Sequence, residues 1–219
     1  MEGVADWLEH PDLYVKREDA TDTQYGGNKV RNLEFILGDA KKKRSKRVAT
    51  LAPLGLNFVA ALSAQAARLG MENHVYHFIP TQNEQILRHA EFSKRQGAKL
   101  HVHQRNYHGG ILKSAAALIP QRFAEEATYV ISPGGSNALG SPQRFQFQDI
   151  DLRKVEGSYG QPLPEAPELI RTVRNLSQIE LDTTYTTKVF SFLKKEITDG
   201  RFIRKKLLYW NTFSSVASV

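Results

Sequence analysis

The chain has 219 residues, of which 41% are hydrophobic and 24% charged, and this composition is typical of a globular protein with a self-sufficient core. It contains no cysteine, which excludes disulfides, thiolate catalysis and cysteine-ligated zinc. No apolar run is long enough to cross a bilayer and the N-terminus does not resemble a targeting peptide, so we expect a cytoplasmic protein without a membrane partner.

The net charge of +7 raises the question of a nucleic-acid partner. The positive charge is concentrated in two short clusters, KKKRSKR at 41–47 and RFIRKK at 201–206. No recognition motif accompanies either cluster, and solvated helix ends and turns are the ordinary explanation for such runs. We therefore expect no nucleic-acid partner, and a basic nucleic-acid binder is kept only as an alternative.

Short apolar runs alternate with helical periods between Gly26 and Ile131, and this pattern predicts βαβ units with a parallel sheet. The first helix is predicted to begin at Lys29. The strands expected after it are RVATLAP, NHVYHFI, AKLHVH and ATYVIS, and the helices between them are NFVAALSAQAARLG, NEQILRHAEFSKRQG and GGILKSAAALI. Asn57 is the expected N-cap of the first of these helices, and Gly70 its expected stop.

Two loops follow strands of this predicted sheet, APLGLN at 52–57 and SPGGSN at 132–137. Ligands bind at the carboxyl ends of strands in open α/β sheets, so we expect a site at these loops. The glycines of the second loop would let its backbone cradle an anion, and a plain tight turn is the alternative. The histidines of HVYH and HVH are expected to lie in pairs on one strand face, and we predict no metal site for them.

Lys29 follows two glycines and an asparagine at the predicted helix start. The partial positive charge at a helix start discourages protonation of an amine, and a neutral amine can form an imine with a carbonyl compound. The glycines would let a ligand approach the backbone. Taken alone, such a motif is more often a surface lysine that follows a turn.

The pattern changes after Gly140, where a segment without clear periodicity suggests a connector. Regular elements return with the predicted helices EAPELIRTVRNL and TTKVFSFLKKEITDG and the strand KKLLYWNTF. We therefore divide the chain into an N-terminal part at 1–140, which includes a small α/β domain, and a second part at 141–219. Tyr159 and Tyr185 stand at the start of helical segments; a tyrosine there can act as an acid or base, although most simply pack.

In their order, these segments resemble pyridoxal-phosphate-dependent enzymes of the tryptophan-synthase-β-like fold, fold type II, and most of all the group with 1-aminocyclopropane-1-carboxylate deaminase and D-cysteine desulfhydrase. The matching segments are YVKREDAT, GGNKVRNLEF, LAPLGLNFVAALSAQAARLGM, PGGSNALG, SYGQPLPEAPELIRTVRN, IELDTTYTTK and LLYWNT. The resemblance implies an α/β fold of open, mostly parallel sheets with flanking helices. It also implies pyridoxal 5'-phosphate as cofactor, conversion of a small amino acid to an α-keto acid and ammonia, and a homo-oligomer.

The resemblance implies a role for each of five positions. Lys29 matches the lysine that holds the cofactor as an internal imine, and Asn57 matches an asparagine that hydrogen-bonds the cofactor. Tyr159 and Tyr185 match the two active-site tyrosines that flank the substrate and help proton transfer. Thr212 matches a threonine near the pyridine nitrogen in the desulfhydrase branch.

The sequence departs from the family pattern at the same site. Leu56 replaces a serine that contacts the substrate, Asn32 replaces a second lysine near the phosphate, and NTFSS replaces HTGG. The stretch between PGGSNALG and SYGQP is too short for a βαβ crossover of roughly thirty residues, although the family carries its Ser-Gly-Gly-Thr phosphate loop there. We therefore predict a shortened chain, which is either an active deaminase or desulfhydrase or a truncated, catalytically impaired relative with weak or no cofactor binding.

Overall fold

The structure is a computed structural model of the chain, and it describes residues 2–78, 84–104, 107–120, 128–135, 161–183 and 185–213. The chain divides into two compact units, one of residues 1–21 with 146–215 and the other of residues 22–145 with 216–219. The first 21 residues therefore belong to the unit that contains the C-terminal segment. The predicted boundary at residue 140, and the predicted connector up to residue 160, lie outside the described residues.

The unit of residues 22–145 contains a parallel sheet with the strand order β4-β3-β2-β5. Its strands are β2 (Arg47–Pro53), β3 (Glu72–Phe78), β4 (Lys99–Gln104) and β5 (Thr128–Ile131). Arg47 of β2 pairs with Glu72 of β3 on one side and with Thr128 of β5 on the other. The predicted α/β class with a parallel sheet is confirmed, and all four strands lie where the apolar runs predicted them.

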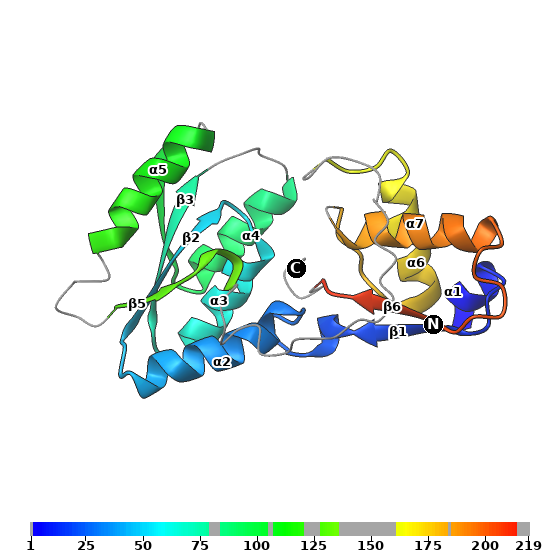
Figure 1. Ribbon diagram of the computed structural model, residues 1–219, viewed down its shortest axis with the longest axis horizontal. Coiled ribbons are helices and arrows are strands. Elements are labelled where there is room, and N and C mark those ends of the chain that lie inside the picture. Colours follow the sequence, from blue (N-terminus) through cyan, green and yellow to red (C-terminus); the bar gives the residue numbers. More distant parts are fainter. Residues whose placement is uncertain are drawn as a thin grey trace. The chain divides into compact units, whose positions relative to one another are not determined.

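The helices described in this unit are α2 (Lys29–Lys42), α3 (Asn57–Arg68), α4 (Glu84–Arg95) and α5 (Tyr107–Leu118). α2, α3 and α4 lie on one face of the sheet, and α5 lies on the other (Figure 1). The right-handed rule for βαβ crossovers explains this division. The chain moves outward from β2 through β3 to β4, and it then returns past β2 to place β5 on the far side.

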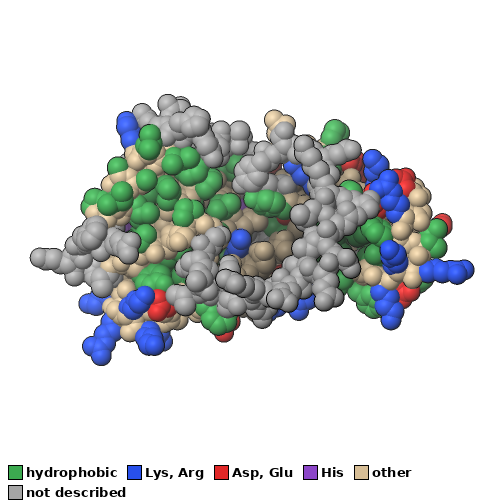
Figure 2. All heavy atoms as spheres, viewed as in Figure 1, with side chains coloured by type: hydrophobic (Ala, Val, Ile, Leu, Met, Phe, Trp, Pro, Cys, Tyr) green, Lys and Arg blue, Asp and Glu red, His purple; other side chains and the backbone are tan. Residues whose placement is uncertain are grey.

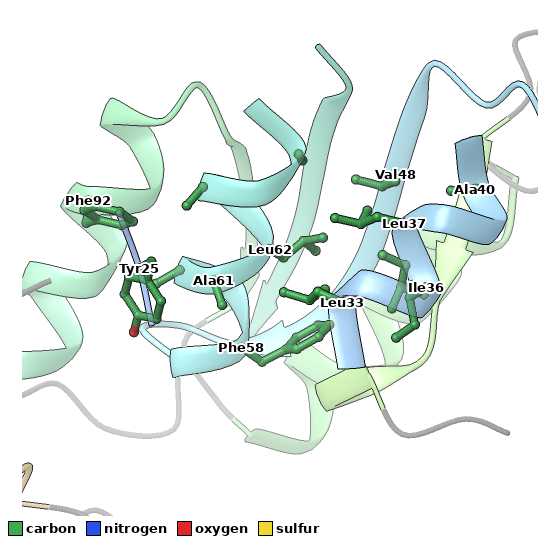
Figure 3. Close-up of a cluster of buried hydrophobic side chains, with 14 residues drawn as sticks. Tyr25, Leu33, Ile36, Leu37, Ala40, Val48, Phe58, Ala61, Leu62 and Phe92 are labelled. Carbon is green, nitrogen blue, oxygen red and sulfur yellow. The ribbon is translucent and has the colours of Figure 1, made fainter. Parts of the chain in front are cut away.

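The core of this unit lies between α2, α3 and the sheet. α2 buries a stripe at helical spacing, Leu33, Ile36, Leu37 and Ala40. These side chains pack with Phe58 of α3 (Figure 3). Because Leu33 is fully buried, its truncation to alanine is expected to cost about 2–5 kcal/mol.

The second unit is built from α1 (Glu2–Trp7), β1 (Leu13–Arg17), α6 (Ala166–Ser177), α7 (Thr186–Thr198) and β6 (Leu207–Asn211). β1 and β6 pair in parallel, with Leu13 opposite Leu207. Phe190 of α7 and Tyr209 of β6 meet edge to face in its core, with ring centroids 5.3 Å apart. α6, α7 and β6 were predicted, whereas α1 and β1 were missed, because elements of six and five residues carry little periodicity.

The first basic cluster lies at the C-terminal end of α2, and the second lies in the turn between α7 and β6. Lysine and arginine side chains gather at the C-terminal end of α2 (Figure 2). Lys41 and Lys42 occupy its last turn, where the helix dipole favours cations, and Lys43 forms an ion pair of 2.7 Å with Asp39. None of the helices in the described part of the chain is long and apolar enough to span a membrane.

The start and end of α3 correct one prediction and confirm another. The helix begins at Asn57 itself, so the prediction that Asn57 is its N-cap was wrong. Leu56 occupies the N-cap position because its backbone is still extended, with φ −67° and ψ 134°, and it has no side-chain oxygen with which to cap. Gly70 has φ +65° just after the helix and confirms the predicted stop.

The prediction that the two histidines of HVYH share a strand face was also wrong. His74 and His77 are three residues apart, and side chains alternate between faces at every residue of a strand. His74 stacks on His101 of β4 with ring centroids 5.2 Å apart. His77 is fully buried, with Nδ1 3.0 Å from the carbonyl oxygen of Ala52. In the HVH pair, the side chain of His103 lies outside the described residues.

The burial of the His77 ring leads us to predict how the stability of the protein depends on pH. Burial lowers the pKa of His77 to about 4, whereas an unfolded histidine titrates near 6.5. As the pH falls, the unfolded chain therefore takes up a proton before the folded chain does. The stability that the neutral His77 ring gives the folded state is complete above pH ~6.5 and is lost as the pH falls towards 4. Between pH 7 and pH 4 we expect the free energy of unfolding to fall by about 3 kcal/mol more in the wild type than in His77→Gln. Urea denaturation at both pH values measures this difference, and parallel losses in the two proteins would contradict it.

Candidate functional site

The site predicted from the sequence lies where the strand order of the sheet reverses. β2 continues through α3 towards β3, whereas β5 pairs with the other side of β2. The loop at 52–57 and the described part of the second loop, 132–135, therefore leave neighbouring strands at the same edge. This reversal is the position at which open α/β sheets bind ligands.

The turn after β5 is held tightly against the core. Pro133–Gly135 form a short 3-10 turn, and the Gly135 N–H donates to the Ser132 carbonyl oxygen at 2.9 Å. Gly135 has φ +73°, and a Cβ there would lie 2.7 Å from the ring of Phe58. Both its conformation and this close approach require glycine. The described part of the loop forms a tight turn, and its last residues, 136 and 137, lie outside the described range.

Lys29 is the first residue of α2, as predicted. The segment before it is anchored by the buried Tyr25, whose ring lies 5.3 Å from that of Phe92 and 6.3 Å from that of His89. Lys29 is half-buried, and this burial lowers the pKa of its ammonium group. No residue in the described part of the chain forms an ion pair or hydrogen bond with its Nζ atom. The amine is therefore desolvated and uncompensated, which favours its neutral, nucleophilic form.

The loop after β2 is fixed from both ends. The Leu54 N–H donates to the Phe78 carbonyl oxygen at 3.1 Å, and the carbonyl oxygen of Gly55 lies 2.9 Å from His89 Nδ1. Leu56 packs against two core clusters, so its side chain serves packing where the family has a serine. Asn57 is half-buried at the first position of α3.

The remaining predicted residues lie in the other unit or outside the described range. Tyr185 directly precedes α7 and is 42% exposed, and Thr212 directly follows β6 and is half-buried. The Tyr209 hydroxyl donates to the Thr186 carbonyl oxygen at 3.0 Å. This bond joins the start of α7, next to Tyr185, to the strand that leads into Thr212. Tyr159 lies outside the described residues.

Asp182 determines the backbone of Tyr185. Its buried carboxylate accepts the Tyr185 N–H at 2.7 Å, the Thr186 N–H at 3.1 Å and the Thr186 hydroxyl at 2.7 Å. These bonds satisfy donors at the start of α7 that have no partner within the helix. The sequence analysis did not single out Asp182, although an aspartate just before a predicted helix is a capping signal.

Two buried carboxylates follow β1, and the sequence analysis missed them together with that strand. The Arg17 guanidinium donates to Asp19 from Nε at 2.8 Å and from Nη2 at 2.6 Å. The Trp210 indole N–H donates to Glu18 at 3.2 Å. Because β1 and β6 are parallel, these acids lie at the same end of the strand pair as Thr212. The described residues include no group of histidines and acids that could hold a metal ion.

Comparison with known proteins gives independent evidence about the family to which the chain is related. The model of a family described as "Pyridoxal-phosphate dependent enzyme" matches residues 2–150. D-cysteine desulfhydrase of Serratia proteamaculans is 31% identical over 140 residues, which cover 59% of this chain and 40% of that protein. The mitochondrial bifunctional D-cysteine desulfhydrase/1-aminocyclopropane-1-carboxylate deaminase of Arabidopsis thaliana is 26% identical over 137 residues, covering 59% and 34%. The chain thus spans two fifths or less of the length of these relatives.

Two solved structures align with this chain over most of their length. The crystal structure of an ACC deaminase homologue aligns with a TM-score of 0.78 at 19% identity, covering 100% of this chain and 89% of that one. A hydrogen sulfide-producing enzyme from Fusobacterium nucleatum aligns with a TM-score of 0.59 at 12% identity, covering 94% and 90%. At these identities the likeness shows the fold alone, and it confirms the predicted architecture.

The residues present fit the aldehyde end of pyridoxal phosphate, because Lys29 offers a half-buried amine with a lowered pKa and no partner among the described residues. Asn32, in the first turn of α2, brings no charge for a phosphate. Asn57 and Thr212 are half-buried polar residues of the kind that hydrogen-bond a heterocycle.

The cap made by Asp182 leads to a stability prediction. Asp182→Ala removes the acceptor for two N–H groups and a hydroxyl, so we expect the free energy of unfolding to fall by about 1–2 kcal/mol. Asp182→Asn keeps an acceptor oxygen and is expected to lose less. Urea denaturation measures both, with Asp199→Ala at the exposed end of α7 as the control. A loss from Asp182→Ala no larger than that of the control would contradict the assignment.

Proposed function

Because the chain belongs to the family of pyridoxal-phosphate dependent enzymes, we propose that it binds pyridoxal 5'-phosphate and acts on a small amino acid. The relatives are named D-cysteine desulfhydrase and 1-aminocyclopropane-1-carboxylate deaminase, and the proposed substrate is of that type. The proposed products are an α-keto acid and ammonia, with sulfide from a thiol substrate. The observation that carries the proposal is the half-buried amine of Lys29 at the start of α2, whose pKa is lowered by burial and which has no partner among the described residues.

Each predicted site residue has a proposed task. The bound cofactor supplies an electron sink for the charge left on the substrate when a bond is broken. The Lys29 amine would hold the aldehyde carbon and, once released, accept or return a proton at the substrate. Asn57 and Thr212 would hydrogen-bond the cofactor ring. The hydroxyls of Tyr159 and Tyr185 would flank the substrate and hold or move a proton.

A second candidate is a catalytically impaired relative with weak cofactor binding. Two observations favour it. Leu56 is packed into the core where the family has a serine, so this position offers a substrate no hydrogen bond. The sequence match spans 40% and 34% of the relatives' lengths, so most of each relative's sequence has no counterpart in the match.

Cofactor binding is tested by adding pyridoxal 5'-phosphate and recording the visible absorbance. We expect the wild type to develop a band and Lys29→Ala to show none, because the amine that binds the aldehyde is gone. Lys42→Ala, at the exposed end of the same helix, is the matched control and should retain the band. A band that is absent from the wild type, or unchanged in Lys29→Ala, would refute the role of Lys29.

Turnover separates the two candidates. With the cofactor supplied, an active enzyme releases keto acid from 1-aminocyclopropane-1-carboxylate or D-cysteine, and we expect Tyr185→Phe to lower kcat by about 10²- to 10⁴-fold. The assay is the rate of keto-acid formation, with Tyr14→Phe, an exposed tyrosine of β1, as the control. A Lys29-dependent band without turnover on either substrate would favour the impaired relative.

A further inference from the structure

β4 forms one edge of the sheet of the 22–145 unit. It pairs with β3 on one side, and no other strand in the described part of the chain pairs with its outer side. An edge strand presents a row of backbone N–H and C=O groups that can pair with another strand. As far as the described residues go, this edge is therefore open to strand addition.

A groove of about 760 Å³ runs between this edge and α4. Its apolar lining comes from both elements and from the loop after β2, and it consists of Leu54, Leu87, Leu100 and Val102. Leu87 is 51% exposed and Val102 is 50% exposed. An apolar groove beside an open strand edge is typical of a surface that another chain covers.

Five charged side chains of α4 line this groove; four of them alternate in sign along the helix, and the fifth, Lys94, stands next to Arg95. Glu84, Arg88, Glu91 and Arg95 of α4 are all exposed and all line the groove. Their spacing of i, i+4, i+7 and i+11 places them in one stripe along the helix. Read from the start of α4 to its end, the stripe is acidic, basic, acidic and basic.

We propose that a second copy of this chain docks on this surface about a two-fold axis. An isologous interface uses the same patch on both copies, so the patch must complement itself. When two α4 helices lie antiparallel across the axis, Glu84 faces Arg95 of the second copy and Arg88 faces Glu91 of the second copy. Every position of the stripe then meets the opposite charge. A partner with a uniformly acidic or basic surface would meet like charge at every second position.

The same two-fold axis also pairs the open edge of β4 with its counterpart in the second copy. It sets β4 antiparallel to β4 of the second copy, so the two sheets join into one and both open edges are closed. Leu87, Leu100 and Val102 lie between the stripe and the edge and become the apolar centre of the interface. Hydrogen bonding, apolar burial and charge pairing are thus satisfied by one symmetric arrangement.

The proposal is tested by measuring the mass of the full chain in solution by sedimentation velocity, at protein concentrations up to about 100 µM. We expect the wild type to sediment at twice the mass of the 24.7 kDa chain. Arg88→Glu places like charges at two symmetric pairs, and so does Glu91→Arg, so each variant alone is expected to dimerise about 30-fold more weakly. Circular dichroism confirms that each variant is folded.

Mixing the two variants gives the decisive result. In a heterodimer, the glutamate introduced by Arg88→Glu faces the arginine introduced by Glu91→Arg, and the unchanged Glu91 of the first variant faces the unchanged Arg88 of the second. Both pairs are then attractive again, so we expect the equimolar mixture to form a heterodimer about as tight as the wild-type dimer, whereas each variant alone dimerises about 30-fold more weakly. Glu34→Arg on α2 and Arg171→Glu on α6 reverse exposed charges elsewhere and should dimerise like the wild type. A monomeric wild type, a dimer that survives both reversals, or a mixture that stays monomeric would overturn the proposal.

Discussion

The contact of Phe58 with Gly135 and Ile36 is the one on which the proposed site depends. It joins the first turn of α3, the turn after β5 and the buried face of α2 at the edge where the strand order reverses. A side chain at Gly135 would come within 2.7 Å of the Phe58 ring, so only glycine allows this approach. Because α2 is held by this packing, the position of its first residue, Lys29, is set by the core.

Burial distinguishes Lys29 from the lysines at the other end of α2. Lys43 has a carboxylate partner and is exposed, and Lys42 lies in the last turn of α2, where the dipole stabilises its charge. Lys29 lies at the opposite end of the same helix, where the dipole opposes its charge, and burial lowers its pKa further. The same helix thus stabilises charged lysines at one end and favours a neutral one at the other.

In the second unit, hydrogen bonds position the backbone of Tyr185. Asp182 caps α7 and the Tyr209 hydroxyl ties that helix to β6, so hydrogen bonds rather than apolar packing set the backbone of Tyr185. Burial is the main cause that raises the pKa of Tyr209, which keeps its hydroxyl protonated as a donor.

Local pattern in the sequence determined the elements of the parallel sheet, the helix start at Lys29 and the glycine stop at Gly70, because periodicity and turn chemistry act over a few residues. It did not reveal β1 or the buried Glu18 beside it. β1 is identified as a strand only by its pairing with β6, nearly two hundred positions later in the chain. Such long-range pairing and burial leave no local signature, so only the tertiary structure decided them.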